Sequence, residues 1–225
     1  MKKFFIKICK FFGFEIIDQN EFTSPTLNKE LNEDLSIINE KSIVLPLGEV
    51  KITRKINSLD VIIRSCTSIK MLTQNKERVF EKEKIDYTLR SIKSLIKSII
   101  EAKKFFGNID FKIMVVDHNS TETNLKKIEE LFTLYDLDFR LINLDVNEYK
   151  DQIAEINQEK KKVTTNQISN MSNINKSLDL SKNSSDLIYF VEDDYLHKKD
   201  SIKEMLFAYE RISSQTNKEL IICPA

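Results

Sequence analysis

The sequence has little of what zinc enzymes and disulfide-stabilised domains require. Only three cysteines and two histidines occur in 225 residues. The cysteines, Cys9, Cys66 and Cys223, are far apart and form no C-x-x-C pair, which argues against a disulfide framework or a structural zinc site. Neither His118 nor His197 belongs to an H-E-x-x-H motif, so a zinc hydrolase is not expected. This cysteine usage fits a reducing, cytoplasmic location.

The sequence also lacks an excess of charge of either sign. Thirty-five basic and thirty-five acidic residues give a formal net charge of zero. Because no field of the whole molecule attracts polyanions, we expect no nucleic-acid partner, and any anionic ligand must be bound by a local group. A length of 225 residues with 41% hydrophobic residues allows one sizeable domain with extensions.

Residues 1–14, MKKFFIKICKFFGF, contain no uninterrupted apolar run that could span a membrane. Their periodicity predicts a basic amphipathic helix. The apolar side of that helix carries Phe4, Phe5, Ile8, Phe11 and Phe12, and the lysines gather on another side. Two interpretations stay open: peripheral contact with the inner face of a membrane, or packing of the phenylalanines on the protein's own core.

Residues 15–58 are polar and poorly periodic, and we interpret them as an extension. Pro25 follows a serine and marks a turn. Further on, Pro46 and Gly48 form a turn signal before a short alternation of apolar and polar residues. This pattern predicts a short hairpin within the extension.

Residues 59–225 alternate between apolar runs and segments of helical periodicity. The predicted strands lie near 61–63, 111–117, 139–145 and 187–191. Predicted helices cover 85–106, a segment that starts near 120–122, a segment with Met171, Ile174 and Leu178 facing inward, and a segment that includes Ile202 and Leu206. Such alternation predicts an α/β domain with a Rossmann-like, mainly parallel, doubly wound sheet.

Two of the predicted strands end in acidic residues. FKIMVVD ends at Asp117, and LIYFVEDDYLH runs from an apolar strand into Glu192, Asp193 and Asp194. Because the carboxyl ends of parallel strands meet at one edge, these acids are expected to face a common crevice. An extended backbone would point Glu192 and Asp194 to the same side, where they could hold Mg²⁺ or Mn²⁺ against a nucleotide diphosphate. His197 is interpreted as a surface residue.

Two stretches resemble family 2 glycosyltransferases. VVDHNSTE is similar to the motif at the family's second strand, and NINKSLDLSKNSSDLIYFVEDDYL resembles its asparagine-containing helix, the following strand and its D-x-D-type metal motif. The resemblance covers about residues 59–212. It implies a glycosyltransferase A-type fold and transfer from a nucleotide-activated sugar to an unknown glycan, lipid or protein acceptor.

The resemblance also implies roles for individual residues. Asp117 would contact the base or ribose of the nucleotide, and Glu192 and Asp194 would match the two acids of the metal motif. Asp193 would take its middle position, and Asn175 would match the helix asparagine.

The sequence departs from the family's pattern after the first two strands. His118 and Asn119 follow Asp117, where the family has a second aspartate and a glycine; asparagine still tolerates a left-handed backbone. Arg64, at the end of the first strand, either contacts a phosphate or forms a surface ion pair.

The chain ends at ELIICPA, where family members continue into an acceptor-binding half with the catalytic base. We therefore expect a truncated enzyme that binds a nucleotide sugar but transfers it poorly, unless Asp193, Asp200 or Glu204 serves as the base. Two other functions stay open: a non-catalytic nucleotide-sugar-binding or interaction module, and a nucleotidyltransferase. The latter normally has a glycine-rich phosphate loop, and RSCTSIK contains no glycine.

Overall fold

The structure, a computed structural model, describes residues 51–68, 83–156, 160 and 162–223, together with Phe5, Ile8, Cys9, Phe11 and Phe12. The chain divides into two compact units. One contains Lys55–Ala208 with Pro224–Ala225, and the other contains Met1–Arg54 and Tyr209–Cys223. The candidate site lies in the first, larger unit.

A four-stranded, all-parallel sheet forms the centre of the larger unit. Its strands are β1 (Ser58–Ser65), β2 (Asp110–Asp117), β3 (Arg140–Asn143) and β4 (Leu187–Glu192). Their order is β3-β2-β1-β4, so the direction of the strand order reverses between β1 and β4. The prediction of an α/β chain with a parallel, Rossmann-like sheet is confirmed. In open sheets of this kind, ligands bind beside the carboxyl ends of strands at such a reversal.

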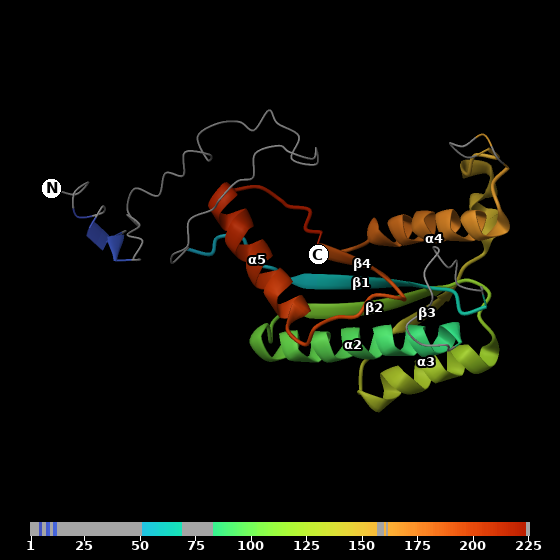
Figure 1. Cartoon of the computed structure of the whole chain (residues 1–225), viewed down its shortest axis with the longest axis horizontal. Helices are drawn as coiled ribbons and strands as arrows, with labels where there is room; N and C mark the ends of the chain where they lie inside the picture. The colour runs from blue at the N-terminus through green and yellow to red at the C-terminus, as the bar shows by residue number, and fades with distance from the viewer. Residues whose placement is uncertain are drawn as a thin grey trace. The chain divides into compact units, whose positions relative to one another are not determined.

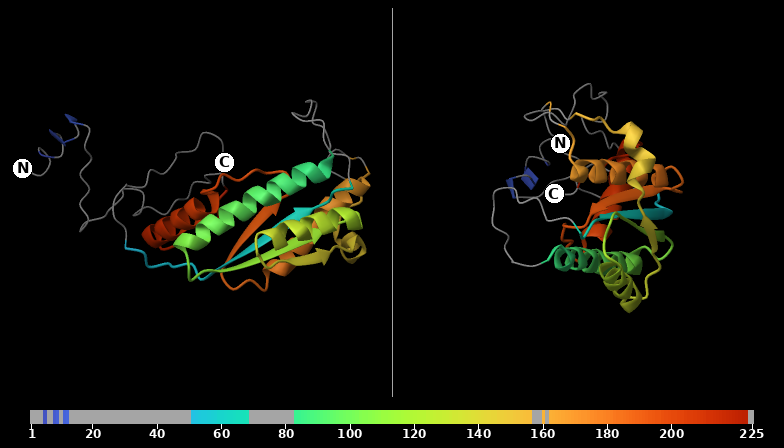
Figure 2. Two further views of the ribbon diagram at one scale, coloured as in Figure 1. Left: turned by 90° about the horizontal axis from the view of Figure 1, so that it is seen from below. Right: turned by 90° about the vertical axis from the view of Figure 1, so that its right-hand side faces the viewer.

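Helices cover both faces of the sheet (Figures 1 and 2). Figure 1 shows α4 (Thr165–Ser181) over one face, whereas α2 (Lys84–Phe105) and α3 (Glu122–Leu134) cover the other. The remaining elements are the 3-10 helix η1 (Val146–Gln152) and α5 (Ser201–Thr216). Because both faces of β1 are covered, Val61, Ile62 and Ile63 at its centre are buried, as the apolar run predicts.

Helix α2 packs on the sheet as its sequence pattern predicts. Ile92, Leu95, Ile96 and Ile99 repeat at helical spacing, and all four are buried. The start of α3 also agrees with prediction, because the Thr121 side chain accepts a hydrogen bond from the backbone N–H of Asn124. These two helices use apolar burial and N-capping in the ordinary way.

Helix α4 differs from its prediction. Met171, Ile174 and Leu178 were expected to face inward, but they are 42%, 38% and 48% exposed. The inward face carries small polar residues instead: Ser169, Ser172, Asn173 and Ser177 are buried. Small side chains let the helix lie close to the sheet, and the Asn173 side-chain amide donates a hydrogen bond of 3.0 Å to the carbonyl oxygen of Val116 in β2. Small polar residues and one hydrogen bond therefore occupy the centre of this interface, while Ile168 and Leu180 of α4 pack against the core cluster that includes Ile62 and Val116.

A row of hydroxyl groups on α2 holds the segment that follows β4. Thr88 donates to the Asp193 carboxylate at 2.8 Å, and Ser91 donates to the carbonyl oxygen of Tyr195 at 2.6 Å. The hydroxyls of Ser94 and Ser98 accept from the backbone N–H groups of His197 and Ile202, each at 2.9 Å. Four successive contacts thus fix this segment along α2 as far as the start of α5.

In the smaller unit, described contacts join residues 53–54 to residues 209–219. The Ser214 hydroxyl accepts from the backbone N–H groups of Thr53 and Arg54, each at 3.0 Å. Arg54 forms a two-point ion pair with Glu219, which also accepts from the Tyr209 hydroxyl. The part of the predicted hairpin before residue 51 lies outside the described residues.

Most of the predicted N-terminal helix also lies outside the described residues. Of residues 1–14, Phe5, Ile8, Cys9 and Phe11 are helical, and Phe5, Phe11 and Phe12 are exposed. None of the helices that the structure describes combines the length and the apolar character needed to cross a membrane.

Candidate functional site

The carboxyl ends of β1, β2 and β4 form one edge of the sheet. In the strand register Ser65 lies opposite Asp117, and Arg64 lies opposite Glu192. The structure therefore brings Arg64, Asp117 and Glu192 to a common edge, as expected from the parallel topology.

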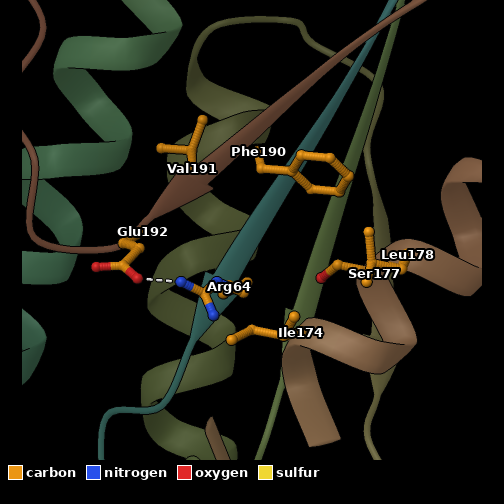
Figure 3. A pocket seen from close by; sticks show the side chains of 7 residues that line it. All are labelled: Arg64, Ile174, Ser177, Leu178, Phe190, Val191 and Glu192. Carbon is orange, nitrogen blue, oxygen red and sulfur yellow. Dashed lines mark hydrogen bonds and ion pairs between the residues drawn. The ribbon is translucent and has the colours of Figure 1, made fainter. Parts of the chain in front are cut away.

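Arg64 and Glu192 form an ion pair at the point where the strand order reverses (Figure 3). Guanidinium Nη2 of Arg64 contacts Oε1 of Glu192, and Nη1 donates to Oδ1 of Asn170 in α4 at 3.1 Å. The Arg64 side chain is 16% exposed and that of Glu192 is 46% exposed. Arg64 thus joins β1, β4 and α4, and of the two side chains that of Glu192 is the more exposed.

A cavity of about 210 Å³ lies beside this ion pair, between β4 and α4. Besides Arg64 and Glu192, it is lined by Ile174, Ser177, Leu178, Phe190 and Val191. Figure 3 shows the Phe190 ring pointing toward Ser177 and Leu178. The cavity is smaller than the roughly 300–1,000 Å³ of typical ligand pockets, so it could take only an apolar part of a nucleotide-sized ligand.

Asp193 points to the opposite side of the sheet from Glu192. Its carboxylate is buried, pairs with Nζ of Lys84 at 2.5 Å, and accepts from the Thr88 hydroxyl. Both partners come from the first turns of α2. The predicted separation of Glu192 and Asp193 to opposite sides is therefore present, and both oxygens of Asp193 are bonded within the protein.

Strand β4 ends at Glu192, so the extended backbone assumed for Asp194 is absent: Asp193 and Asp194 form a turn. The Asp194 side chain is exposed, and no polar partner for it lies among the described residues. Within that part of the chain, no three His, Cys, Asp or Glu side chains form a group suited to a metal ion. Of the three predicted acids after β4, only Glu192 and Asp194 could still contact a cation. Glu192 is already paired with Arg64, and Asp194 is exposed.

Asp117 is buried and bonded within the protein. Its carboxylate accepts from the Ser65 hydroxyl at 2.5 Å, and from the backbone N–H and the hydroxyl of Ser120 at 3.0 and 2.7 Å. These bonds join the ends of β1 and β2 to the loop before α3. Contact with a nucleotide stays a prediction, and it would need to use the remaining acceptor capacity of this carboxylate.

The two residues after Asp117 adopt distinct structural roles. Asn119 has a φ of 62°, so it adopts the left-handed backbone that asparagine tolerates. The neighbouring His118 ring lies toward α4, with Nδ1 2.6 Å from the Ser169 hydroxyl.

Asn175, the predicted helix asparagine, is half-buried in α4 and has no hydrogen-bond partner among the described residues. Asn173 occupies the structurally important position instead. It is buried and bonds β2 through the Val116 carbonyl. Its place on the same helix face as Ser169 and Ser177 could have identified it, because those three residues repeat at spacings of four.

His197 was interpreted as a surface residue, and this was wrong, because the ring is half-buried. Its Nε2 lies 2.9 Å from the Tyr189 hydroxyl, and its buried Nδ1 has no hydrogen-bond partner among the described residues. Burial lowers the pKa of His197 below its ordinary value of 6.5. The segment between Asp194 and α5 is thus packed against the domain.

Sequence reasoning missed Asn170, Lys84 and Thr88. Lys84 lies 109 positions before its partner Asp193, so no local pattern joins the two residues. Thr88 belongs to the hydroxyl row of α2, and hydroxyl residues repeated at helical spacing on one side of an amphipathic helix are a pattern that could have been noticed. Searches with protein-family models and among curated proteins give no match to this chain.

Proposed function

We propose that the larger unit binds the diphosphate of a nucleotide-activated sugar at the edge formed by β1 and β4. The observation that carries this proposal is the meeting of Arg64 and Glu192 where the order of a parallel sheet reverses, beside a cavity. Arginine offers a planar fork of N–H donors that suits phosphate oxygens. The motifs that resemble family 2 glycosyltransferases support a sugar nucleotide as the ligand.

The proposal includes Mg²⁺ or Mn²⁺ as the cofactor, although no three acidic, His or Cys side chains of the described residues form a group suited to such an ion. Such ions accept one or two protein carboxylates and fill their other positions with water and phosphate oxygens. Glu192 and Asp194 would supply the carboxylates, provided that Glu192 gives up its contact with Arg64. When bound, the ion would offset negative charge on a departing diphosphate. The role of Arg64 would be to hold the diphosphate against that edge.

As an enzyme, the protein would transfer the sugar from the bound nucleotide to an acceptor. Transfer needs a group that removes the proton of the acceptor hydroxyl. Two of the acids considered as internal bases are already engaged, because Asp193 is buried with Lys84 and Asp200 pairs with Lys203 at 2.7 Å. These contacts favour a second candidate function, a nucleotide-sugar-binding module without transfer activity.

Calorimetry with UDP and GDP tests the binding proposal. We expect clearly tighter binding in excess Mn²⁺ than in EDTA, and Asp194→Ala should remove most of that gain. Asp138→Ala is the matched control, because Asp138 is an exposed aspartate next to the amino end of β3, at the opposite edge of the sheet. Equal affinity in Mn²⁺ and EDTA would contradict the proposal.

A transfer assay separates the two candidate functions. Labelled UDP-sugars and GDP-sugars are incubated with the protein and a mixture of acceptors from cell extracts. Labelled product in excess of the protein would establish an enzyme, and Asp193→Asn and Glu204→Gln would then locate the base. Binding without product supports the non-catalytic module.

A further inference from the structure

Residues 1–14 have no part in the proposed function, and they combine a high local positive charge with exposed aromatic residues. The chain as a whole has a formal net charge of zero, whereas this segment contains four lysines and no acidic residue. We propose that residues 1–14 bind the surface of an anionic lipid bilayer, as a helix that lies in the plane of the interface. This interaction would be independent of nucleotide binding.

Three phenylalanines of the segment are largely accessible to solvent. Phe5, Phe11 and Phe12 are 62%, 86% and 68% exposed. Phe5 and Phe11 are helical, and the backbone N–H of Phe12 donates to the carbonyl oxygen of Ile8 at 3.2 Å. Because removal of aromatic rings from water is favourable, these rings offer apolar area to a surface outside the described chain.

The basic residues of the segment have a helical spacing of their own. Lys3, Lys7 and Lys10 are four and three positions apart, as residues on one side of a helix are. In such a helix the phenylalanines fall on another side, so the apolar and basic sides are distinct. Helices that lie in a bilayer interface have this pattern, with lysines toward the head groups and phenylalanines toward the acyl chains.

The combination of charge and apolar area selects a lipid surface as the partner. An anionic bilayer offers negative head groups next to an apolar layer, whereas a nucleic acid offers the negative charge without a layer that could take the phenylalanines. Near such a surface each lysine raises the affinity by about fivefold. This contribution falls as the ionic strength rises.

Sedimentation of the full chain with lipid vesicles tests the binding. We expect much more protein to sediment with vesicles of phosphatidylcholine and phosphatidylserine than with phosphatidylcholine alone, and NaCl should release it. Phe11→Ser combined with Phe12→Ser should weaken binding by at least roughly tenfold, because the apolar side loses two rings. Leu134→Ser is the matched control: Leu134 is an exposed apolar residue at the end of α3, and its replacement should leave binding unchanged.

Neutralising two lysines tests the contribution of charge. Lys7→Gln combined with Lys10→Gln should weaken binding to the anionic vesicles by at least roughly tenfold and should reduce the effect of NaCl. Lys126→Gln combined with Lys127→Gln removes the same charge from exposed positions of α3 and should change binding much less. Equal losses in the two double variants would mean that residues 1–14 are not the binding surface.

A tryptophan probe reports where the aromatic side of the helix lies. The chain contains no tryptophan, so Phe11→Trp provides a single reporter. In buffer its fluorescence should be that of an exposed indole, and it should shift to shorter wavelength with the anionic vesicles but not with phosphatidylcholine alone. Short-wavelength emission already in buffer would place the ring against the protein's own core or a second copy, and would overturn the proposal.

The remaining outcomes also decide the question. Equal sedimentation with both kinds of vesicle, none with either, or wild-type binding by the double serine variant would overturn the proposal. Urea denaturation of the same variant excludes a purely structural explanation, because its midpoint should equal that of wild type. A lower midpoint would show that Phe11 and Phe12 pack within the folded protein, contrary to the proposal.

Discussion

Helices α2 and α4 pack on opposite faces of the same sheet, and they do so with different side chains. The face of α2 toward the sheet is mainly aliphatic, with Ile92, Ile96 and Ile99 almost fully buried. The face of α4 toward the sheet is polar and small, and its aliphatic residues Ile174 and Leu178 are directed to the cavity beside β4. One helix buries its apolar stripe, and the other leaves it accessible.

The difference indicates that the two faces of the sheet contribute differently to stability and to ligand access. Aliphatic burial is the main favourable term in folding, so the α2 face should supply most of the stability. On the α4 side, directional hydrogen bonds from Asn173 and Arg64 fix the helix on the sheet and leave an apolar surface unfilled. A ligand that enters the cavity would contact that surface without displacing the core.

The largest expected effect comes from truncating the same kind of side chain on the two faces. Ile96→Ala should lower the free energy of unfolding by about 2–5 kcal/mol, because it leaves a cavity in a packed core. Leu178→Ala, in the accessible stripe of α4, should cost less than about 1 kcal/mol. Urea denaturation of both variants measures the difference, and similar losses would mean that the two faces do not differ as described.

A smaller effect is expected from the two asparagines of α4. Asn173→Ala removes the bond to Val116 and should cost about 1–3 kcal/mol. Asn175→Ala should change stability by no more than about 0.5 kcal/mol, because the residue has no bond to lose among the described residues. Since both changes alter helix propensity equally, thermal or urea unfolding isolates the tertiary contribution. A larger loss for Asn175→Ala would reverse this assignment.

The smallest expected effect concerns pH, on the α2 side of the sheet. Burial lowers the pKa of His197 from its ordinary value of 6.5, so below that pH the unfolded chain binds more protons than the folded one. Stability should therefore fall as the pH falls through this region, and His197→Gln should reduce the slope. Unfolding curves at several pH values test this; the same slope in both proteins would exclude His197 as the source.

Strand β1 and helix α2 could be predicted because their apolar side chains are buried, whereas in the equally apolar β4 only Val191 is buried. The same reasoning failed for α4. Met171, Ile174 and Leu178 do repeat at helical spacing, but Ile174 and Leu178 line the cavity beside β4, while the face toward the sheet carries small serines and Asn173, which bonds to Val116. Hydrophobic periodicity cannot detect an interface of that kind.

The sequence could predict which edge of the sheet holds the candidate site, but not which residues contact one another there. Parallel topology places Asp117 and Glu192 at one edge, and Asn119 has the left-handed backbone that asparagine tolerates. The partners of the acids depend on residues far away in the sequence. Glu192 pairs with a residue 128 positions earlier, and only the folded chain shows that this residue is Arg64.

The row of hydroxyls on α2 has a consequence for how the segment after β4 opens. The backbone N–H groups of His197 and Ile202 donate to Ser94 and Ser98 of that helix. Amide hydrogens exchange with solvent only when such bonds break, so these two should be protected although residue 197 belongs to no helix or strand. The stretch between the acidic turn and α5 should then exchange together with α2, as one cooperative unit.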